Sequence, residues 1–149
     1  MPPRPVVHSN TDVEFKPAPI NPSWIVEGEP VARNAILSRS DDETACTILW
    51  ECSAGTFRWH YDFDETIHFV EGGVTIDDGH GTPHTLGPGD MIFFPAGSQA
   101  VWTVEKYVRK VAFCRKVLPE PVGRLIRLTR RVKHTLSPPK DNGSLMSSN

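Results

Sequence analysis

From Thr44 to Lys116 the sequence is a series of short β-rich runs separated by turn residues at close intervals. Tight turns can join only antiparallel neighbours, so this spacing is typical of an antiparallel β-sandwich or barrel. No window in residues 40–117 has the 3.6-residue apolar period of an amphipathic helix, and no internal repeat is present. The runs are, in order, "TACTILWEC", "TFRWHY", "TIHFV", "VTI", "HTL", "MIFF", "AVWTV" and "VRKVAFCRK".

The segments on either side of this region differ from it in composition. Seven of the 14 prolines lie in the first 30 residues, and proline removes a backbone donor and fixes φ. We therefore expect an extended arm over residues 1–23, followed by one β domain over residues 24–117. Residues 118–136 are predicted to form a basic amphipathic helix, and the polar end, residues 137–149, is predicted to be disordered. The apolar positions near helical spacing are Val122, Leu125, Ile126 and Val132.

A chain of 149 residues is most simply a single domain, large enough to fold without disulfides. Its three cysteines, Cys46, Cys52 and Cys114, form no Cys-x-x-Cys pair, and their odd number argues against a disulfide framework. We expect buried thiols in a reducing compartment. The start of the sequence lacks an apolar run of signal-peptide length, and no stretch approaches a membrane span, so we expect a cytoplasmic protein with no membrane partner.

Charge is distributed unevenly along the chain. Residues 1–105 contain 16 Asp and Glu against 5 Lys and Arg, whereas residues 106–149 contain 11 Lys and Arg against 2 Asp and Glu. The simplest interpretation is attraction between the acidic body and the basic end, within one chain or between two subunits. A contact of the basic segment with nucleic acid or anionic lipid is the alternative. Nucleic-acid contact by residues 124–133 is not expected, because this stretch has no aromatic residues for base stacking and no known reading motif.

Two turn-bounded motifs lie inside the β-rich region. The first is "GTFRWHYDFDETIHFVEGG", residues 55–73, in which two strand-like runs flank an acidic bend. The second is "GPGDMIFFPAG", residues 87–97, in which two tight turns enclose an apolar run. With "VWTVEKYVRK" downstream, they resemble the motifs of the cupins, small jelly-roll barrels, and most closely the single-domain ureidoglycine aminohydrolase and ethanolamine-utilisation types. The resemblance covers residues 24–117 and implies an all-β cupin barrel that commonly pairs through one sheet, so we expect a homodimer.

The resemblance also implies where a metal site would lie. In metal-binding cupins the first motif supplies two histidines and a glutamate, and the second supplies one more histidine. At the matching positions this chain has Trp59, Tyr61, Glu65 and Ala100. An interior transition-metal site needs about three N, O or S donors, a number that Glu65 with a phenol does not reach. We therefore expect neither a family-type metal nor a cofactor.

A remodelled metal site is an alternative that involves the neighbouring histidines. His60 should face away from the lumen if the aromatic residues on either side of it face inward, and His68 has the wrong parity relative to Glu65. A β-bulge at the acidic bend would change this parity and bring His60 together with Tyr61 and Glu65.

The same positions predict an aromatic lumen with a single charge. A buried carboxylate is costly unless it is hydrogen-bonded, so we expect Glu65 to pair with Tyr61, a Trp N–H, Arg58 or a cationic ligand. The aromatic residues either line a cavity for a small, nitrogen-bearing or planar metabolite, or simply fill the barrel as a core. The positions that share the inferred inward parity are Trp59, Tyr61, Glu65, Ile67, Phe69 and Trp102.

Three functions follow from these patterns. The first is a small-molecule-binding cupin, with or without catalysis on a ureido or amino metabolite, in which Glu65 is the general acid or base, Tyr61 is its hydrogen-bond partner, and Trp59, Ile67, Phe69 and Trp102 bind the ligand. The second is a non-catalytic sensor or interaction module whose arm and basic end contact a partner. The third is a metal-dependent cupin with the remodelled site.

Overall fold

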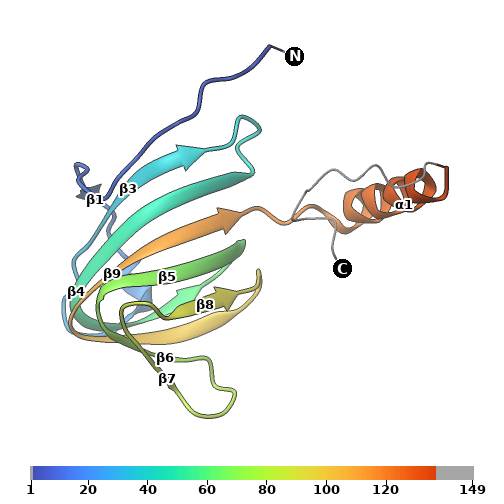
Figure 1. Ribbon diagram of the computed structural model, residues 1–149. Helices are drawn as coiled ribbons and strands as arrows, with labels where there is room; N and C mark the ends of the chain where they lie inside the picture. The colour runs from blue at the N-terminus through green and yellow to red at the C-terminus, as the bar shows by residue number, and fades with distance from the viewer. Residues whose placement is uncertain (1, 137–149) are drawn as a thin grey trace. The chain divides into compact units, whose positions relative to one another are not determined.

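The computed structural model describes residues 2–136, which divide into one unit ending at Val117 and a second that begins at Leu118. Figure 1 shows the first unit as strands and the second as a helix. The short elements near the N-terminus are β1 (Lys16–Pro17), a 3-10 turn (Pro22–Trp24) and β2 (Ile25–Glu27). The remaining elements are β3 (Ala32–Arg39), β4 (Ala45–His60), β5 (Asp64–Gly72), β6 (Val74–Asp77), β7 (His84–Leu86), β8 (Met91–Phe94), β9 (Gln99–Arg115) and α1 (Glu120–Leu136).

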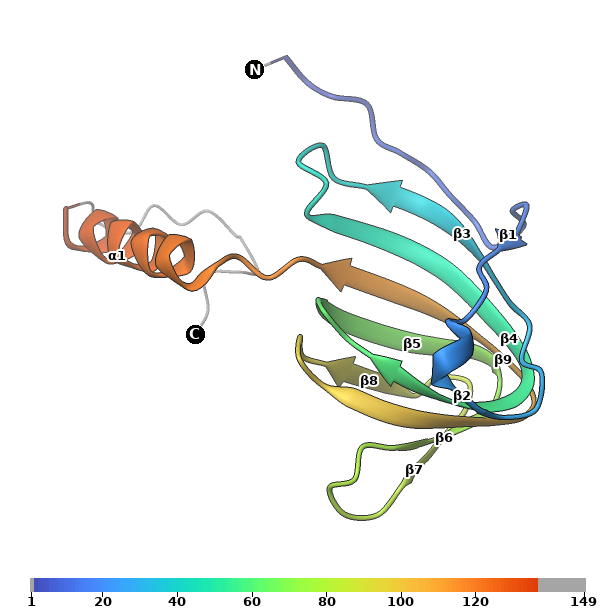
Figure 2. The same ribbon diagram turned by 180° about the vertical axis from the view of Figure 1, so that it is seen from behind.

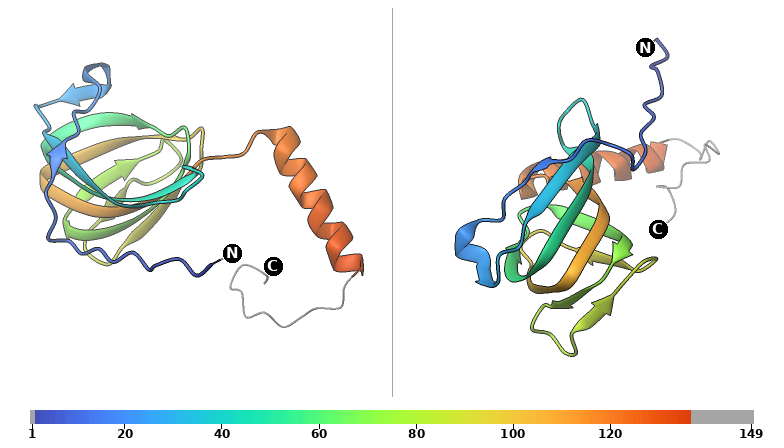
Figure 3. Two further views of the ribbon diagram at one scale, coloured as in Figure 1. Left: turned by 90° about the horizontal axis from the view of Figure 1, so that it is seen from above. Right: turned by 90° about the vertical axis from the view of Figure 1, so that its left-hand side faces the viewer.

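The strands form one antiparallel sheet that curves around a common interior (Figures 2 and 3). Its order is β1-β3-β4-β9-β5-β8; β2 adds to β4, and the β6–β7 pair adds to β9. Every pairing is antiparallel. The all-β class expected from the close spacing of turns is thereby confirmed.

Two long strands, β4 and β9, form the centre of the barrel. They pair from Ala45 opposite Arg115 to His60 opposite Gln99. The sequence suggested two separate runs for each of these strands, but in the structure each strand is continuous through an irregularity between Ser53 and Gly55. A Cβ at Gly55 would lie 2.7 Å from the Pro30 ring, so glycine lets the chain pass closely at this bend.

Two features of the first 40 residues were not predicted. Residues 32–39 form a full strand, β3, although they lack the apolar alternation that signals one. The proline-rich arm was expected to stay out of the sheet, yet Lys16 and Pro17 pair with Arg33 and Asn34 on β3. Proline is compatible with this position because β1 is an edge strand, which needs fewer backbone donors.

The second unit contains the helix that was expected over residues 118–136. Its apolar residues are partly exposed, and Arg124 and Glu120 form an ion pair of 2.9 Å one turn apart. Among residues 2–136, no helix is long and apolar enough to cross a membrane. The disordered tail predicted for residues 137–149 lies outside the described residues.

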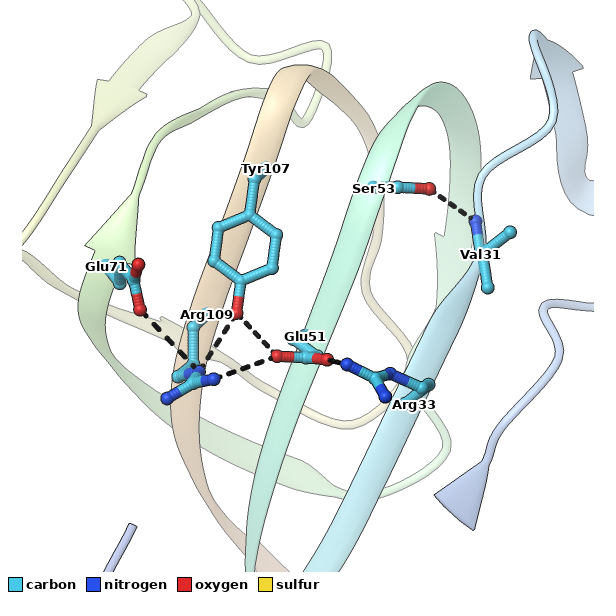
Figure 4. Close-up of polar contacts among 7 residues, drawn as sticks. All are labelled: Val31, Arg33, Glu51, Ser53, Glu71, Tyr107 and Arg109. Carbon is cyan, nitrogen blue, oxygen red and sulfur yellow. Dashed lines mark hydrogen bonds and ion pairs between the residues drawn. The ribbon is translucent and has the colours of Figure 1, made fainter. Parts of the chain in front are cut away.

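The outward face of the two long strands carries a partly exposed ion-pair network centred on the buried Glu51 (Figure 4). Glu51 accepts hydrogen bonds from Tyr107 at 2.5 Å and from Arg109 at 3.1 Å, and it also pairs with Arg33. The guanidinium groups of Arg33 and Arg109 lie over the ring of Phe15, 5.4 and 5.3 Å from its centroid. This aromatic residue therefore attaches the arm to the barrel wall by cation–π contact.

Strand β5 ends at a glycine that no other residue can replace without strain. Gly72 has a φ of +73°, and a Cβ there would lie 2.0 Å from the carbonyl oxygen of Tyr107 on β9. The next residue, Gly73, donates its N–H to that same oxygen at 3.0 Å. The close approach therefore fixes how β5 leaves the sheet and β6 begins.

We expect Gly72→Ala to lower the free energy of unfolding by about 2–4 kcal/mol, because it adds a steric clash to the cost of positive φ. Gly89→Ala is the matched control: its φ is +92°, and no atom lies within 4 Å of the added Cβ, so we expect about 1 kcal/mol. Urea unfolding of both variants tests the difference. Equal losses would show that the contact with Tyr107 does not constrain the turn.

A second prediction concerns the pH dependence of stability. Burial opposes ionisation of Glu51, but hydrogen bonds from Tyr107, Arg109 and Arg33 outweigh it and lower its pKa from the ordinary 4.5. Ionised Glu51 therefore stabilises the fold fully above about that pH, and the contribution is lost as pH falls through the folded-state pKa. We expect Glu51→Gln to lower the free energy of unfolding by about 2 kcal/mol at pH 7.

The difference between wild type and Glu51→Gln should shrink when unfolding is measured from about pH 5 down to about pH 3. Glu71→Gln is the control, because this side chain is 60% exposed and its contact with Arg109 is long, at 3.8 Å. We expect this substitution to change the free energy of unfolding by less than about 0.5 kcal/mol. A Glu51→Gln difference that stays constant over this range would contradict the assigned role of the carboxylate.

Candidate functional site

The interior of the barrel contains an ion pair formed by two of its central strands. Successive residues on a strand face opposite sides, and on β9 the even-numbered positions from Val108 to Cys114 face inward and are buried. Lys110 lies opposite Trp50 on β4, and Cys114 lies opposite Glu65 on β5. On the inward face of β9, Ala112 lies between Lys110 and Cys114. Its small side chain leaves room for the Lys110 side chain to reach Glu65.

The Lys110 ammonium and the Glu65 carboxylate meet directly. Nζ of Lys110 donates to Oε1 of Glu65 at 2.6 Å, and the two side chains are 6% and 5% exposed. The ammonium also lies 4.9 Å from the ring centroids of Trp50 and Trp102. The positive charge is therefore neutralised by one carboxylate and held over two electron-rich indole faces.

The energetics of this arrangement are asymmetric. Transferring both charges from water costs several kcal/mol per ion, so the pair as a whole contributes little net stability. Removing one partner alone leaves an unpaired buried charge, at a cost of about 3–5 kcal/mol. A buried pair in an aromatic interior is thus weak evidence of a stabilising role, and it marks a functional-site candidate.

Tyr61 lies beside this pair but has another partner. Its hydroxyl oxygen accepts a hydrogen bond from Nε1 of Trp102 at 3.1 Å, and its ring stacks on Phe94 with centroids 4.1 Å apart. Burial, and then the negative charge of Glu65, raise the pKa of Tyr61 well above its ordinary value of 10.0. Tyr61 therefore stays a neutral phenol that positions the Trp102 indole.

The structure brings the residues selected from the sequence together in one interior cluster. Trp59 is half-buried at its edge, and the other five are nearly or fully buried. Edge-to-face and stacked ring contacts connect Trp50, Phe57, Trp59 and Trp102. The rings pack tightly, and none of the selected residues lines either of the cavities described below.

Two expectations about Glu65 are wrong. It is not the only charge in the lumen, because Lys110 pairs with it, and its hydrogen-bond partner is this lysine and not Tyr61. Arg58, another expected partner, is exposed. Sequence reasoning missed Lys110 although a signal existed: it is eight residues from Trp102, so strand parity alone places the two on one face.

The residues present do not fit the metal site of the family. Trp59, Tyr61 and Ala100 stand at three ligand positions, and the Lys110 ammonium already occupies the carboxylate of Glu65 at the fourth. Within residues 2–136, no three His, Cys, Asp or Glu side chains converge on one point. His60, required for a remodelled site, is exposed, and its ring lies 5.1 Å from that of Trp24.

A cavity lies at one end of the barrel and reaches Cys114, which belongs to the buried core. We call this end, where β4 and β5 begin and β9 finishes, the mouth (Figure 1). The cavity measures about 200 Å³, and its lining includes Cys46, Phe63 and Cys114. Cys114 is the cross-strand neighbour of Glu65, although neither Glu65 nor Lys110 lines this cavity itself. A larger cavity of about 420 Å³ lies between β9 and the β6–β7 pair, away from these residues.

Comparison with known proteins places the fold. A model of the EutQ-like cupin domain matches residues 39–112. Among solved structures, a protein of unknown function of the DUF861 family from Pseudomonas syringae is 23% identical, with a TM-score of 0.64, over 70% of this chain and 46% of its own. The EutQ protein of Clostridium difficile is 23% identical, with a TM-score of 0.51, over 59% of this chain and 64% of its own.

A third structure, a putative ethanolamine utilization protein Q from Salmonella typhimurium, is 17% identical, with a TM-score of 0.52, over 70% of this chain and 96% of its own. This chain thus spans less than two thirds of the first two proteins. No curated protein matches it. The motifs, the curved antiparallel sheet and these matches agree: the chain belongs to the cupin superfamily, with an EutQ-like cupin domain.

Proposed function

We propose that this cupin binds a small metabolite at the mouth and recognises it through Lys110 and Glu65. The observation that carries the proposal is the buried contact of 2.6 Å between these two side chains. A chain that needed only a stable core would fill this position with apolar groups, since such a replacement is often neutral or stabilising. The retained pair instead supplies a strong donor and a strong acceptor in the interior, where Glu65 is the cross-strand neighbour of Cys114, a residue that lines the mouth cavity.

The chemistry of the pair favours a ligand with both a donor and an acceptor. The Lys110 ammonium has three N–H donors, of which Glu65 takes one, and the carboxylate has further lone pairs. A ureido group presents N–H donors beside a carbonyl acceptor and complements both charges. The cavity of about 200 Å³ suits a molecule smaller than a drug, because pockets for drug-sized ligands measure roughly 300 Å³ or more.

Any catalysis at this site would use Glu65 as the general acid or base. Lys110 would orient the carboxylate and stabilise negative charge on a substrate oxygen. Trp59, Tyr61, Ile67, Phe69 and Trp102 form the apolar wall behind the pair, and within this wall Tyr61 positions Trp102 through its hydrogen bond. Water excluded by these rings strengthens both electrostatic effects.

The experiment compares stability with binding in Glu65→Gln, Lys110→Met and the double variant Glu65→Leu/Lys110→Met. We expect Lys110→Met to lower the free energy of unfolding by about 3 kcal/mol and the double variant to regain most of it. All three should lose at least about tenfold in affinity for N-carbamoylglycine, the ureido probe, in isothermal titration calorimetry. Glu71→Gln, an exposed position on the same strand, is the control.

Wild-type affinity in the double variant would show that the pair has no part in recognition. Absence of binding of N-carbamoylglycine to wild type, with binding of ethanolamine instead, would reject the ureido assignment and keep an amino ligand. Binding of neither compound would contradict the proposed ligand class.

A second candidate function is an interaction module, favoured by the helix of the second unit. Leu125 and Leu128 are 62% and 58% exposed on a helix rich in arginine. We expect a chain ending at residue 118 to keep the affinity for N-carbamoylglycine if the barrel is the functional part. Loss of that affinity, with an unchanged unfolding midpoint, would show that binding requires the helix.

The homodimer expected from the sequence stays a prediction. The outward face at β8 and β9 has apolar side chains that a partner subunit could cover. Phe93 and Phe113 face the same outward row, because both lie opposite Thr66, and they are 56% and 49% exposed.

A further inference from the structure

Two cysteines lie directly opposite each other at the mouth of the barrel. Cys46 on β4 and Cys114 on β9 are cross-strand partners. The backbone N–H of Lys116 donates to the carbonyl of Thr44 at 2.7 Å, so the pair two residues further in is of the same hydrogen-bonded type. Cα atoms in such pairs are about 5.5 Å apart, within the Cα range of disulfides, whereas their Cβ atoms, about 5 Å apart, must approach to about 4 Å for the bond to form.

The side chains of this pair point to the same place. Both residues line the mouth cavity, and Cys46 is near enough to Cys114 to contribute to the raised pKa of the Cys114 thiol. Cys46 is the more exposed of the two, whereas Cys114 is buried. The third cysteine, Cys52, is fully buried further along β4 and does not line this cavity.

The rim of the cavity is mainly cationic. Arg39, Arg115 and Lys116 line it, with Glu43 as the one carboxylate among the lining residues. Arg115 is paired with Asp64, and Arg39 and Lys116 together outnumber Glu43, so an excess positive charge remains. A cleft with an excess of one sign of charge attracts small molecules of the opposite sign.

We propose that Cys46 and Cys114 form a dithiol site that exchanges with anionic low-molecular-weight disulfides. The Cys46 thiolate attacks one sulfur of the small disulfide, which forms a mixed disulfide and releases one small thiolate. Cys114 then loses its proton to solvent and attacks Sγ of Cys46, which forms the protein disulfide and releases the second thiolate. The balance is two protein thiols and one small disulfide converted into one protein disulfide and two small thiols.

The environment of Cys114 sets the order and the speed of the two steps. Burial, then the charge of Glu65 and then Cys46, raise the pKa of Cys114 to about 12, while Lys110 opposes this effect. Because only the thiolate is nucleophilic, Cys114 is a poor first attacker and a slow resolving thiol. The mixed disulfide on Cys46 should therefore accumulate, and its resolution should accelerate about tenfold per pH unit below the pKa of Cys114.

The experiment treats the reduced full-length protein with excess oxidised glutathione and follows it by mass spectrometry and non-reducing peptide mapping. We expect one glutathionyl group on Cys46, followed by a peptide pair cross-linked through Cys46 and Cys114. Cys114→Ala should stop at the mixed disulfide, Cys46→Ala should not react, and Cys52→Ala should behave as wild type.

Modification of Cys114 in Cys46→Ala, or a wild-type mixed disulfide that never converts to the cross-link, would overturn the proposal.

A second experiment tests the preference for anionic disulfides with the double variant Arg39→Gln/Lys116→Gln. We expect wild type to react faster with oxidised glutathione than with the cationic disulfide cystamine by about tenfold at low salt, and the double variant to lose this preference. Equal wild-type rates with both reagents would reject the anionic class. Because the readout is covalent mass, it does not depend on N-carbamoylglycine binding.

Discussion

A lysine ammonium held on a carboxylate inside a shell of indole and phenol rings is the constraint on which the rest of this barrel depends. The pair joins β5 to β9, and the Trp50 face brings β4 to the same point. The cost of removing two charges from water is offset only while every element of the shell is in place. Ala112 must be small and Trp102 must be held by Tyr61, so the packing of the interior and the placement of the two charges depend on each other.

The two faces of the central strands show how strongly the register is specified. Trp50 and Lys110 face inward, whereas their chain neighbours Glu51 and Arg109 meet on the outside. A slip of one residue would place Glu51 in the aromatic interior and expose an indole, since the side-chain period of a strand is two. The residues on each face thus oppose a one-residue slip between β4 and β9. In both Trp50–Glu51 and Arg109–Lys110, one residue faces the interior and the other belongs to the outer ion-pair network.

Much of the fold could be predicted from turn spacing and strand parity, but the identity of the buried charges could not. Parity placed Tyr61, Glu65 and Trp102 in one cluster, as the structure does. Lys110 was missed because lysine is expected at the surface, and only the tertiary contact with Glu65 makes its burial tolerable. Strand β3 was missed for a related reason. Its pairing with β1 on one side and β4 on the other stabilises it, whereas its own sequence lacks the apolar pattern of a strand.

The mouth joins the two chemistries that this barrel can support. Cys114 is adjacent to Glu65 across the β5–β9 pair, and Cys46 and Cys114 both line the mouth cavity. A bound metabolite would therefore cover the thiol that reacts first. A thiol adduct at Cys46 would in turn fill the opening and bring its own charge close to Lys110. If the proposed ligand occupies this cavity of about 200 Å³, ligand binding and thiol exchange should compete for the same space.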